Sequence, residues 1–479
     1  EITTLLQTML ANDEISKEVY DNLVPSKPRT ARFYFLPKIH KPNITGRPII
    51  SGNGCATEGI SSFVDEHIKK YVTMLPSHIK DTTHFIQTVE SATLPAQCFL
   101  VTMDVTSLYT NIPNHEGITA VNRTLVENNY NSMATRLSLL KLLTHVLHKN
   151  NFSFNGINYL QLGGTAMGTK VAPSYANLFM GQLEKKLLNA CPKKPLIFKR
   201  FIDDIFMAFE GSEQDLTQFI TFCNDFHHSI KFTAEYSETR VVFLDTIVIK
   251  EGNKLKTTLY TKETDTHSYL HYTSAHPKHM KEKGPYGQFL RLRRNCHDDQ
   301  DYIHHSNNMV KDYLNRGYPK SPLLKVKEQA SQRVRSQLLK PKPKKLKTND
   351  RIPLILTYNP TNPPIMKSIM KRWEILTSTA DNKALYGDPP IIATRRAKNL
   401  KDKLMRAELN PQTGSNQPHR ILEKLHCNHR SCIIKPYFTF KKTVTSTTTG
   451  RTYLKKHIGN CTTQNVVYLL TCKICLKQY

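Results

Sequence analysis

KRFIDDIFMAF, residues 199–209, decides the fold, because it predicts a β-hairpin with an acidic tip. Turn preference explains one aspartate at such a tip. Asp203 and Asp204 side by side in an apolar hairpin repel each other unless a cation lies between them. The pattern alone leaves two interpretations open, a catalytic carboxylate pair and an ordinary Asp-rich turn.

A second acidic strand precedes this hairpin. FLVTMDVTSLYTNIP, residues 99–113, predicts an apolar strand that ends at Asp104, with Tyr109 five residues later. Transfer of a nucleotidyl group uses two divalent ions about 4 Å apart, which converging carboxylates bind. The strand places Asp104 at a sheet edge, where the ring of Tyr109 is positioned to line a sugar pocket and exclude a 2′-hydroxyl. The alternative is that Asp104 is a helix N-cap.

A glycine-containing loop lies between these two strands. QLGGTAMGTKVAPSYANLFM, residues 161–180, begins at Gln161 and includes Gly164 and Gly168, which permit close backbone approach. Pro173 then begins a helix. The loop is placed to contact a template and an incoming base, and the alternative is a plain connection to a packed helix.

A basic hairpin lies upstream. FLPKIHKPNITGRPIIS, residues 35–51, joins two β-like runs by a glycine turn and places Lys38, Lys41 and Arg47 to bind a triphosphate. The alternative is surface charge on a hairpin. Helical patterns at about residues 60–75, 135–149 and 173–190 separate strands at 99–105, 199–209 and 241–249, which predicts an α+β sheet domain.

The charge balance favours a polyanionic partner. The 479 residues include 67 Lys and Arg against 39 Asp and Glu, a formal net charge of +28. Neutralising phosphates releases counterions, so nucleic acid is the natural partner, and a basic surface like that of a ribosomal protein is the alternative. Because no apolar run approaches the roughly 20 residues that cross a bilayer, no membrane association is expected. The oligomeric state is not specified by any pattern.

The order of the motifs is that of reverse transcriptases. FLPKIHKP, MDVTSLYTNIP, GTAMGTKVAPSYANLFM, RFIDDIF, FLDT and LYTKETDTHSYLHYTSAHP closely resemble the motifs of Penelope-like retroelements, relatives of telomerase reverse transcriptase, and the resemblance covers nearly the whole chain. It implies a right-hand polymerase fold. The implied regions are an N-terminal fragment (1–30), fingers (31–103), palm (104–250), thumb (251–320), a basic linker with helices (321–425) and a Cys-rich region with a truncated GIY-YIG endonuclease (426–479).

The resemblance also implies roles for individual residues. Asp104 and Asp203 match the principal Mg²⁺ ligands of a two-ion site, and Asp204 matches a third carboxylate. The other matches are the Val105 carbonyl for the metal, Tyr109 for sugar selection, Gln161, Gly164 and Gly168 for template and nucleotide, Lys38 and Arg47 for the triphosphate, and Phe243, Leu244 and Asp245 for the primer grip. Lys231 lies near the expected general-acid lysine, and its alignment is left open.

The partners implied are an RNA template, a DNA primer or target, and dNTPs. The implied location is the nucleus, with the cytoplasm during synthesis. Arg291, Arg293 and Arg294 of the thumb are expected along the primer–template backbone, and a solvated helix face is the alternative.

The last 53 residues concentrate half of the ten cysteines, which favours metal over disulfides. Zn²⁺ is expected at Cys427 and Cys432, with Cys461 as a further ligand, and at Cys472 and Cys475, with unpaired thiols as the alternative. Tyr468 and Tyr479 resemble the two halves of a GIY-YIG motif. Because the nuclease arginine and glutamate are not found after them, endonuclease activity is not expected. The chain starts at Glu1 rather than Met, so further residues are expected upstream.

Three other functions were weighed against a reverse transcriptase. An RNA-directed RNA polymerase is disfavoured by Tyr109, because an aromatic sugar gate selects deoxynucleotides. A decayed element that only binds nucleic acid is disfavoured by the intact carboxylates and glycines. A stand-alone nuclease is excluded by the missing nuclease residues.

Overall fold

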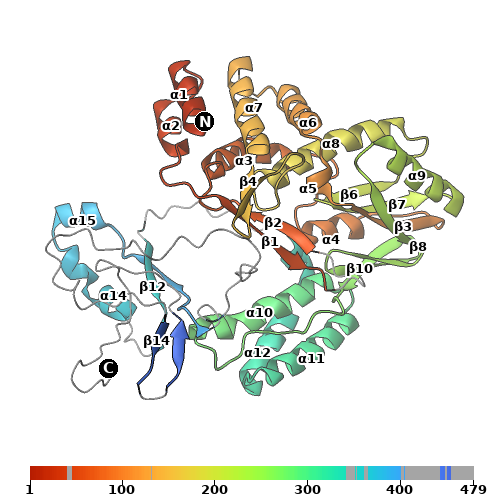
Figure 1. The fold of residues 1–479 in the computed structure, drawn as a ribbon. Coiled ribbons are helices and arrows are strands. Elements are labelled where there is room, and N and C mark those ends of the chain that lie inside the picture. Colours follow the sequence, from red (N-terminus) through yellow and green to blue (C-terminus); the bar gives the residue numbers. More distant parts are fainter. Residues whose placement is uncertain are drawn as a thin grey trace, which may run out of the picture. The chain divides into compact units, whose positions relative to one another are not determined.

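The chain folds into two units, residues 1–406 and 407–479. The computed structural model describes residues 1–39, 46–130, 132–340, 351, 353–360, 365–400, 404, 443–447 and 450–454. In the second unit, the described residues form an antiparallel hairpin of β14 (Thr443–Thr445) and β15 (Thr452–Leu454). The remaining elements belong to the first unit (Figure 1).

The first unit mixes helices and strands. The helices are α1 (Ile2–Ala11), α2 (Lys17–Leu23), α3 (Glu58–Val72), α4 (Thr82–Glu90), α5 (Leu108–Asn111), α6 (Asn114–Glu127), α7 (Met133–His148), α8 (Ala172–Ala190), α9 (Glu213–Phe226), α10 (Lys278–Asn295), α11 (Asp299–Asn315), α12 (Lys320–Ser331), α13 (Arg335–Leu339), α14 (Ile365–Leu376) and α15 (Ala380–Tyr386). The strands are β1 (Ala31–Pro37), β2 (Gly46–Ser51), β3 (Cys98–Val105), β4 (Asn151–Phe154), β5 (Ile157–Leu160), β6 (Ile197–Phe201), β7 (Asp204–Glu210), β8 (Phe232–Ser237), β9 (Arg240–Phe243), β10 (Thr246–Glu251), β11 (Lys254–Leu259), β12 (Pro353–Thr357) and β13 (Ile391–Arg395).

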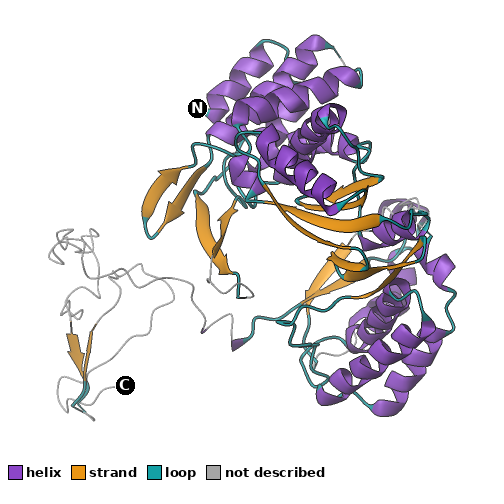
Figure 2. Ribbon diagram, turned by 90° about the vertical axis from the view of Figure 1, so that its right-hand side faces the viewer, coloured by secondary structure: helices purple, strands orange, loops and turns teal. Residues whose placement is uncertain are grey.

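Four antiparallel strands form the central sheet, in the order β6-β7-β3-β8. Its side chains alternate between two faces, as in any pleated strand. Val101 and Met207 face a large core with α3, α6, α7 and α8, whereas Leu100 and Phe206 face a smaller core with α4 and β9–β11. Figures 1 and 2 show the helices of the large core gathered on one side of these strands. The sheet is therefore covered on both faces, which leaves its strand ends for polar groups.

A second sheet, the N-terminal sheet, has the order β2-β1-β4-β5. The strand β1 pairs with β2 in antiparallel fashion and with β4 in parallel fashion. Ala31, Ile50 and Ala166 form a small core beneath it. The predicted basic hairpin is confirmed as β1 and β2, and residues 151–160 extend the same sheet.

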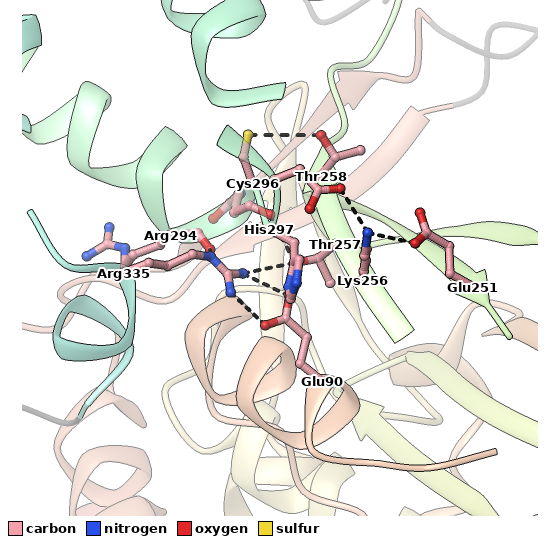
Figure 3. A network of polar contacts seen from close by, with 11 residues as sticks. Glu90, Glu251, Lys256, Thr257, Thr258, Arg294, Cys296, His297 and Arg335 are labelled. Atoms are coloured by element: carbon pink, nitrogen blue, oxygen red, sulfur yellow. Dashed lines mark hydrogen bonds and ion pairs between the residues drawn. The ribbon is translucent and has the colours of Figure 1, made fainter. Parts of the chain in front are cut away.

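The helices α10, α11 and α12 form a C-terminal bundle around Phe289, Tyr302 and Tyr313. Figure 3 shows how this bundle and the following α13 are attached to α4 and β11. Glu90 accepts two hydrogen bonds from the Arg335 guanidinium, at 2.6 and 2.9 Å, and one from the Thr257 hydroxyl at 2.8 Å. His297 Nδ1 lies 3.2 Å from the same carboxylate. The side chains of Glu90 and Arg335 are only 12% and 13% exposed, so the pair is mostly removed from water.

The three predicted helices are confirmed as α3, α7 and α8. The predicted strand at residues 241–249 is wrong in one respect, because it breaks into β9 and β10 at Leu244, which has a φ of +55°. Both halves are apolar, so hydrophobicity alone does not reveal the turn. None of the described helices combines the length and apolar composition that a bilayer crossing requires.

Candidate active site

The three predicted carboxylates converge at one end of the central sheet. Asp104 near the end of β3 is the direct cross-strand partner of Asp204 at the start of β7. Asp203 lies in the two-residue turn between β6 and β7, and its carbonyl accepts the Val105 N–H at 3.0 Å. Two like charges directly opposite each other on neighbouring strands are destabilising. The fold thus brings together acidic groups that repel.

The electrostatics of Asp204 reflect this crowding. Burial and then the negative charges of Asp203 and Asp104 raise the pKa of its carboxyl, while Lys262 and Arg47 lower it, and the result is a pKa of about 6. A bound divalent cation favours ionised carboxylates and offsets their repulsion. The donor set, carboxylate oxygens alone, is also the one that Mg²⁺ prefers. The residues present therefore fit a divalent metal.

The turn that carries Asp203 is strained. Ile202 has a φ of +59°, whereas Asp203 does not have a positive φ. This sign pattern is that of a type II′ turn, in which the first central position is normally glycine. A β-branched residue in this region costs roughly 1–3 kcal/mol and persists where surrounding contacts enforce it. Strain of this kind concentrates at functional sites.

Tyr109 in α5 lies beside the carboxylates. Burial and, second, the charge of Asp203 together raise the pKa of its hydroxyl to about 12. The hydroxyl is therefore neutral at ordinary pH. The ring is partly buried against the large core, which fixes its position next to Asp203.

The glycine loop is packed against Tyr109 and against β2. The Thr165 N–H donates to the Tyr109 carbonyl at 2.7 Å, and a Cβ on Gly164, which has a φ of +68°, would lie 2.5 Å from that carbonyl oxygen. A Cβ on Gly168, with a φ of +125°, would lie 2.3 Å from the Ile50 oxygen. The close backbone approach predicted for these glycines is confirmed, but the partner is the protein's own backbone. The loop joins the N-terminal sheet to α5.

Gly164→Ala is expected to destabilise the protein by about 2 kcal/mol or more, because the new Cβ meets backbone atoms at a positive φ. Gly163→Ala is the matched control, since open space surrounds the adjacent glycine. Urea denaturation of both variants measures the effect. Equal unfolding free energies for the two variants would contradict the packing described for this loop.

Gln161 supports the same loop. Its side-chain oxygen accepts a hydrogen bond from Asn150 Nδ2 at 2.8 Å, and its Nε2 donates to the Gly163 carbonyl at 2.9 Å. The amide is thus engaged within the protein on both sides. A contact with template or nucleotide stays a prediction, since each of these amide atoms can form a second hydrogen bond.

The predicted triphosphate cations differ in their placement. Arg47 in β2 is exposed and lies within electrostatic reach of Asp204. Lys38 follows the end of β1 and is half-buried, and Lys41 lies outside the described residues. Lys262, after β11, also acts on Asp204 and was missed by the sequence reasoning. The only signal for it was a basic, His-rich string without a defined structure.

The hydrogen bonds of Lys231 do not support a role as general acid. Its ammonium donates to the Asn224 carbonyl, and to the His227 carbonyl at 3.1 Å, at the end of α9. Cations at a helix C-terminus satisfy carbonyls that lack intrahelical partners. Lys231 therefore serves as a C-terminal cap in this structure.

The predicted primer-grip residues form the turn between β9 and β10. Phe243 is buried and packs on Phe85 and Phe206. Asp245 accepts hydrogen bonds from the Thr82 hydroxyl at 2.5 Å and from Arg291 at 2.6 and 2.9 Å. These bonds lower the pKa of Asp245 against the opposing effect of its burial. Asp245 thus ties α4 to α10, a role that the sequence reasoning did not anticipate.

The arginines predicted to lie along a nucleic-acid backbone are partly engaged within the protein. Arg291 pairs with Asp245, and Arg293 donates to Asp299 at 2.5 Å while lying over the Tyr302 ring. The Arg294 carbonyl accepts a hydrogen bond from Arg335 at 3.0 Å. Arg293 therefore helps to assemble the C-terminal bundle, and Arg291 attaches the bundle to the β9–β10 turn.

A second acid–histidine group lies near α6 and α9. Glu116, His227 and His228 bring one potential ligand atom each within 4.8 Å of one another. His227 Nδ1 accepts the N–H groups of Ser229 and Ile230 at 3.2 Å, so the neutral ring carries its proton on Nε2, which lies 2.9 Å from Glu116. A metal-bound histidine instead donates from its other nitrogen. The hydrogen bonds thus oppose metal binding at His227.

The predicted zinc and endonuclease residues all lie outside the described residues. They are Cys427, Cys432, Cys461, Cys472, Cys475, Tyr468 and Tyr479. These assignments stay predictions.

Two family models match parts of the chain. Residues 39–272 match the family model of reverse transcriptases (RNA-dependent DNA polymerases), and residues 268–325 match that of the animal helix-turn-helix domain. The second match covers most of the C-terminal bundle and was not predicted. No curated protein matches the chain.

Solved polymerase structures are similar at low identity. Telomerase from Candida tropicalis, truncated from its C-terminal domain, is 12% identical with a TM-score of 0.36, over 47% of this chain and 54% of that one. Telomerase from Candida albicans in complex with a telomeric RNA fragment is 8% identical with a TM-score of 0.41, over 68% and 67%. The RNA-dependent RNA polymerase of a human picobirnavirus is 11% identical with a TM-score of 0.44, over 65% and 63%.

The fold is of the α+β class, as expected. Residues 39–272, just under half of the chain, are therefore similar to reverse transcriptases, the RNA-dependent DNA polymerases. Reverse transcriptases generally use divalent metal ions, which the carboxylate cluster suits. The finer domain limits and the residue roles stay predictions.

Proposed function

We propose that the protein is the reverse transcriptase of a Penelope-like retroelement and extends a DNA 3′ end on an RNA template. The observation that carries the proposal is the convergence of Asp104, Asp203 and Asp204 beside the Tyr109 ring. Acidic ligands for a metal and an aromatic wall for a sugar are the two elements that a deoxynucleotide polymerase needs. The net charge of +28 suits a nucleic-acid substrate.

In this proposal the three aspartates, with the Val105 carbonyl, hold two Mg²⁺ ions. When bound, the ions activate the primer hydroxyl and stabilise the departing pyrophosphate. Arg47 and Lys262, both exposed and within electrostatic reach of Asp204, supply positive charge for the triphosphate.

The remaining residues position the substrates. Tyr109 excludes a 2′-hydroxyl by its bulk, and its neutral hydroxyl adds no charge beside the metal ligands. The loop with Gly164 and Gly168 fixes the distance between the N-terminal sheet and α5, and so between Arg47 and Tyr109. Lys38 directly follows β1, and Gln161 begins the glycine loop. The proposed location is the nucleus, where DNA ends are found, with the cytoplasm during synthesis.

A primer-extension assay tests the proposal. The purified chain is given a DNA primer on an RNA or a DNA template, with dNTPs or NTPs and with or without Mg²⁺. We expect Mg²⁺-dependent incorporation of dNTPs on the RNA template. Preferred incorporation of NTPs would instead identify an RNA polymerase, and binding of primer–template without any incorporation would identify a decayed element.

A further inference from the structure

Arg200 in β6 has no exposed surface, which is rare for a permanently charged side chain. It lies three residues before Asp203, between the hairpin turn and α8. Its charge is balanced by Glu184 in α8, whose side chain is also buried. Arg200 donates from Nε to Glu184 Oε1 and from Nη2 to Oε2, the latter at 3.3 Å.

The pair is fully bonded to its surroundings. The Ser77 hydroxyl donates to Glu184 at 2.6 Å, and Arg200 Nη1 donates to Asn177 Oδ1 at 2.7 Å. The backbone of Arg200 is engaged on the outer edge of β6, where its N–H donates to the Ser77 carbonyl and its carbonyl accepts the Ile79 N–H. The guanidinium can therefore occupy one position only.

One further bond links this cluster to the site. Arg200 Nη1 donates to the Ile202 carbonyl at 2.9 Å. Ile202 is the residue with the positive φ, and its carbonyl belongs to the peptide group that precedes Asp203. The guanidinium thus joins the strained turn to Asn177 of α8.

Stability alone does not require this arrangement. Replacing a buried ion pair by apolar residues of similar volume is often neutral or stabilising, because the desolvation of two charges offsets their attraction. An arginine offers what an apolar residue lacks, a rigid fork whose donors reach Glu184, Asn177 and Ile202 at once.

We infer that Arg200 is a positioning residue: it holds the Ile202–Asp203 peptide in its strained conformation and so sets the Asp203 carboxylate for metal binding. The inference rests on the proposed function, since it gives the turn a purpose in polymerisation. Arg200 itself is fully buried and is not one of the proposed metal or nucleotide ligands.

The test compares Arg200→Lys with Arg335→Lys. Both remove a guanidinium from a largely buried pair with a glutamate. Among the described residues, however, Arg335 bonds to Glu90, Thr257 and the Arg294 carbonyl rather than to the hairpin turn. Thermal unfolding is measured in divalent-free buffer and with Mg²⁺ alone, and primer extension is measured over a range of Mg²⁺ concentrations. All measurements are made where each variant is folded by circular dichroism.

We expect both variants to lose stability in divalent-free buffer. Only Arg200→Lys should lose most of the Mg²⁺-induced rise in unfolding temperature, need at least about tenfold more Mg²⁺ for half-maximal extension and show about tenfold or more lower kcat. An Mg²⁺ response in Arg200→Lys equal to that of Arg335→Lys would overturn the inference.

A double variant, Arg200→Met with Glu184→Met, removes both buried charges together. We expect it to unfold at a higher temperature than Arg200→Met alone but to keep the weak Mg²⁺ response, because the Ile202 carbonyl still lacks its donor. Recovery of the wild-type response would reduce Arg200 to a structural ion pair. If the wild-type chain itself extends no primer, the proposed function fails, whereas the Mg²⁺-induced shift still tests Arg200.

Discussion

Asp203→Asn is expected to abolish Mg²⁺-dependent incorporation of dNTPs, with a loss of roughly 1,000-fold or more. The amide keeps the size of the side chain and removes the charge that a divalent ion requires. Because Asp203 lies in a turn whose backbone bonds do not involve its side chain, primer–template binding should change little. Primer extension measures the first effect, and a gel-shift assay with RNA measures the second.

The same substitution should stabilise the metal-free fold. The pKa of Asp204 is raised to about 6 from its ordinary 3.8, partly by the charge of Asp203. A carboxyl with a raised folded pKa contributes stability that is present below about pH 4 and is lost as the pH rises through about 6. Without Asp203, the pKa of Asp204 should fall and this loss should shrink. Urea denaturation in divalent-free buffer at pH 5 and pH 7.5 measures the difference.

Glu210→Gln is the matched control for both effects. Glu210 is exposed at the opposite end of β7 from Asp204, so removing its charge changes the same strand without touching the site. We expect it to leave incorporation and the pH dependence near those of the wild type. Polymerisation by Asp203→Asn at a rate close to that of Glu210→Gln would refute the assignment of the metal ligands.

The acidic hairpin was predictable because neighbouring residues in the sequence specify both of its strands and its turn. An apolar run with two central aspartates specifies both strands and the turn, and the apolar strand ending at Asp104 specifies its partner. The cross-strand register does not follow from alternation, because β3 is buried at consecutive positions and its sheet is covered on both faces. Motif order then identified the class of enzyme.

Contacts between distant residues were not predictable. Asp245 was expected to grip a primer, yet its partners Thr82 and Arg291 are far from it in sequence and nothing in the FLDT string indicates them. Arg200 looks like a surface cation in a basic chain, because its burial depends on Glu184 and Ser77 from other elements. Charge counts predict a polyanionic partner but cannot distinguish a free arginine from one already neutralised.

The sequence predicted that the glycines allow close backbone approach, but not which groups they approach, because those groups are distant in sequence. A sequence indicates that a backbone must approach something closely, but not what it approaches. At Gly164 and Gly168 the neighbours are the carbonyls of Tyr109 and Ile50, which come from two different parts of the fold. The loop therefore packs against both the N-terminal sheet and Tyr109, the residue proposed to select the sugar.

Tyr109→Ala is expected to admit ribonucleotides, lowering the preference for dNTPs over NTPs by about 100-fold. The ring is fixed by its packing on the large core and by the Thr165 N–H bond to its own carbonyl, so it cannot yield to a 2′-hydroxyl. Removing the ring opens that space. Steady-state kcat/KM for matched deoxy- and ribonucleotides on one RNA template measures the preference.

Tyr109→Phe separates the bulk of the ring from its hydroxyl. The hydroxyl is neutral, with its pKa raised to about 12 beside Asp203, so its loss should leave both the charge of the site and the sugar preference unchanged. Tyr109→Ala also removes buried ring surface and should cost stability, about 3 kcal/mol. Ratios of kcat/KM within one variant cancel the folded fraction, so destabilisation alone cannot imitate a change of selectivity. An unchanged ratio in Tyr109→Ala, or a collapsed ratio in Tyr109→Phe, would show that steric exclusion by this ring is not the basis of sugar selection.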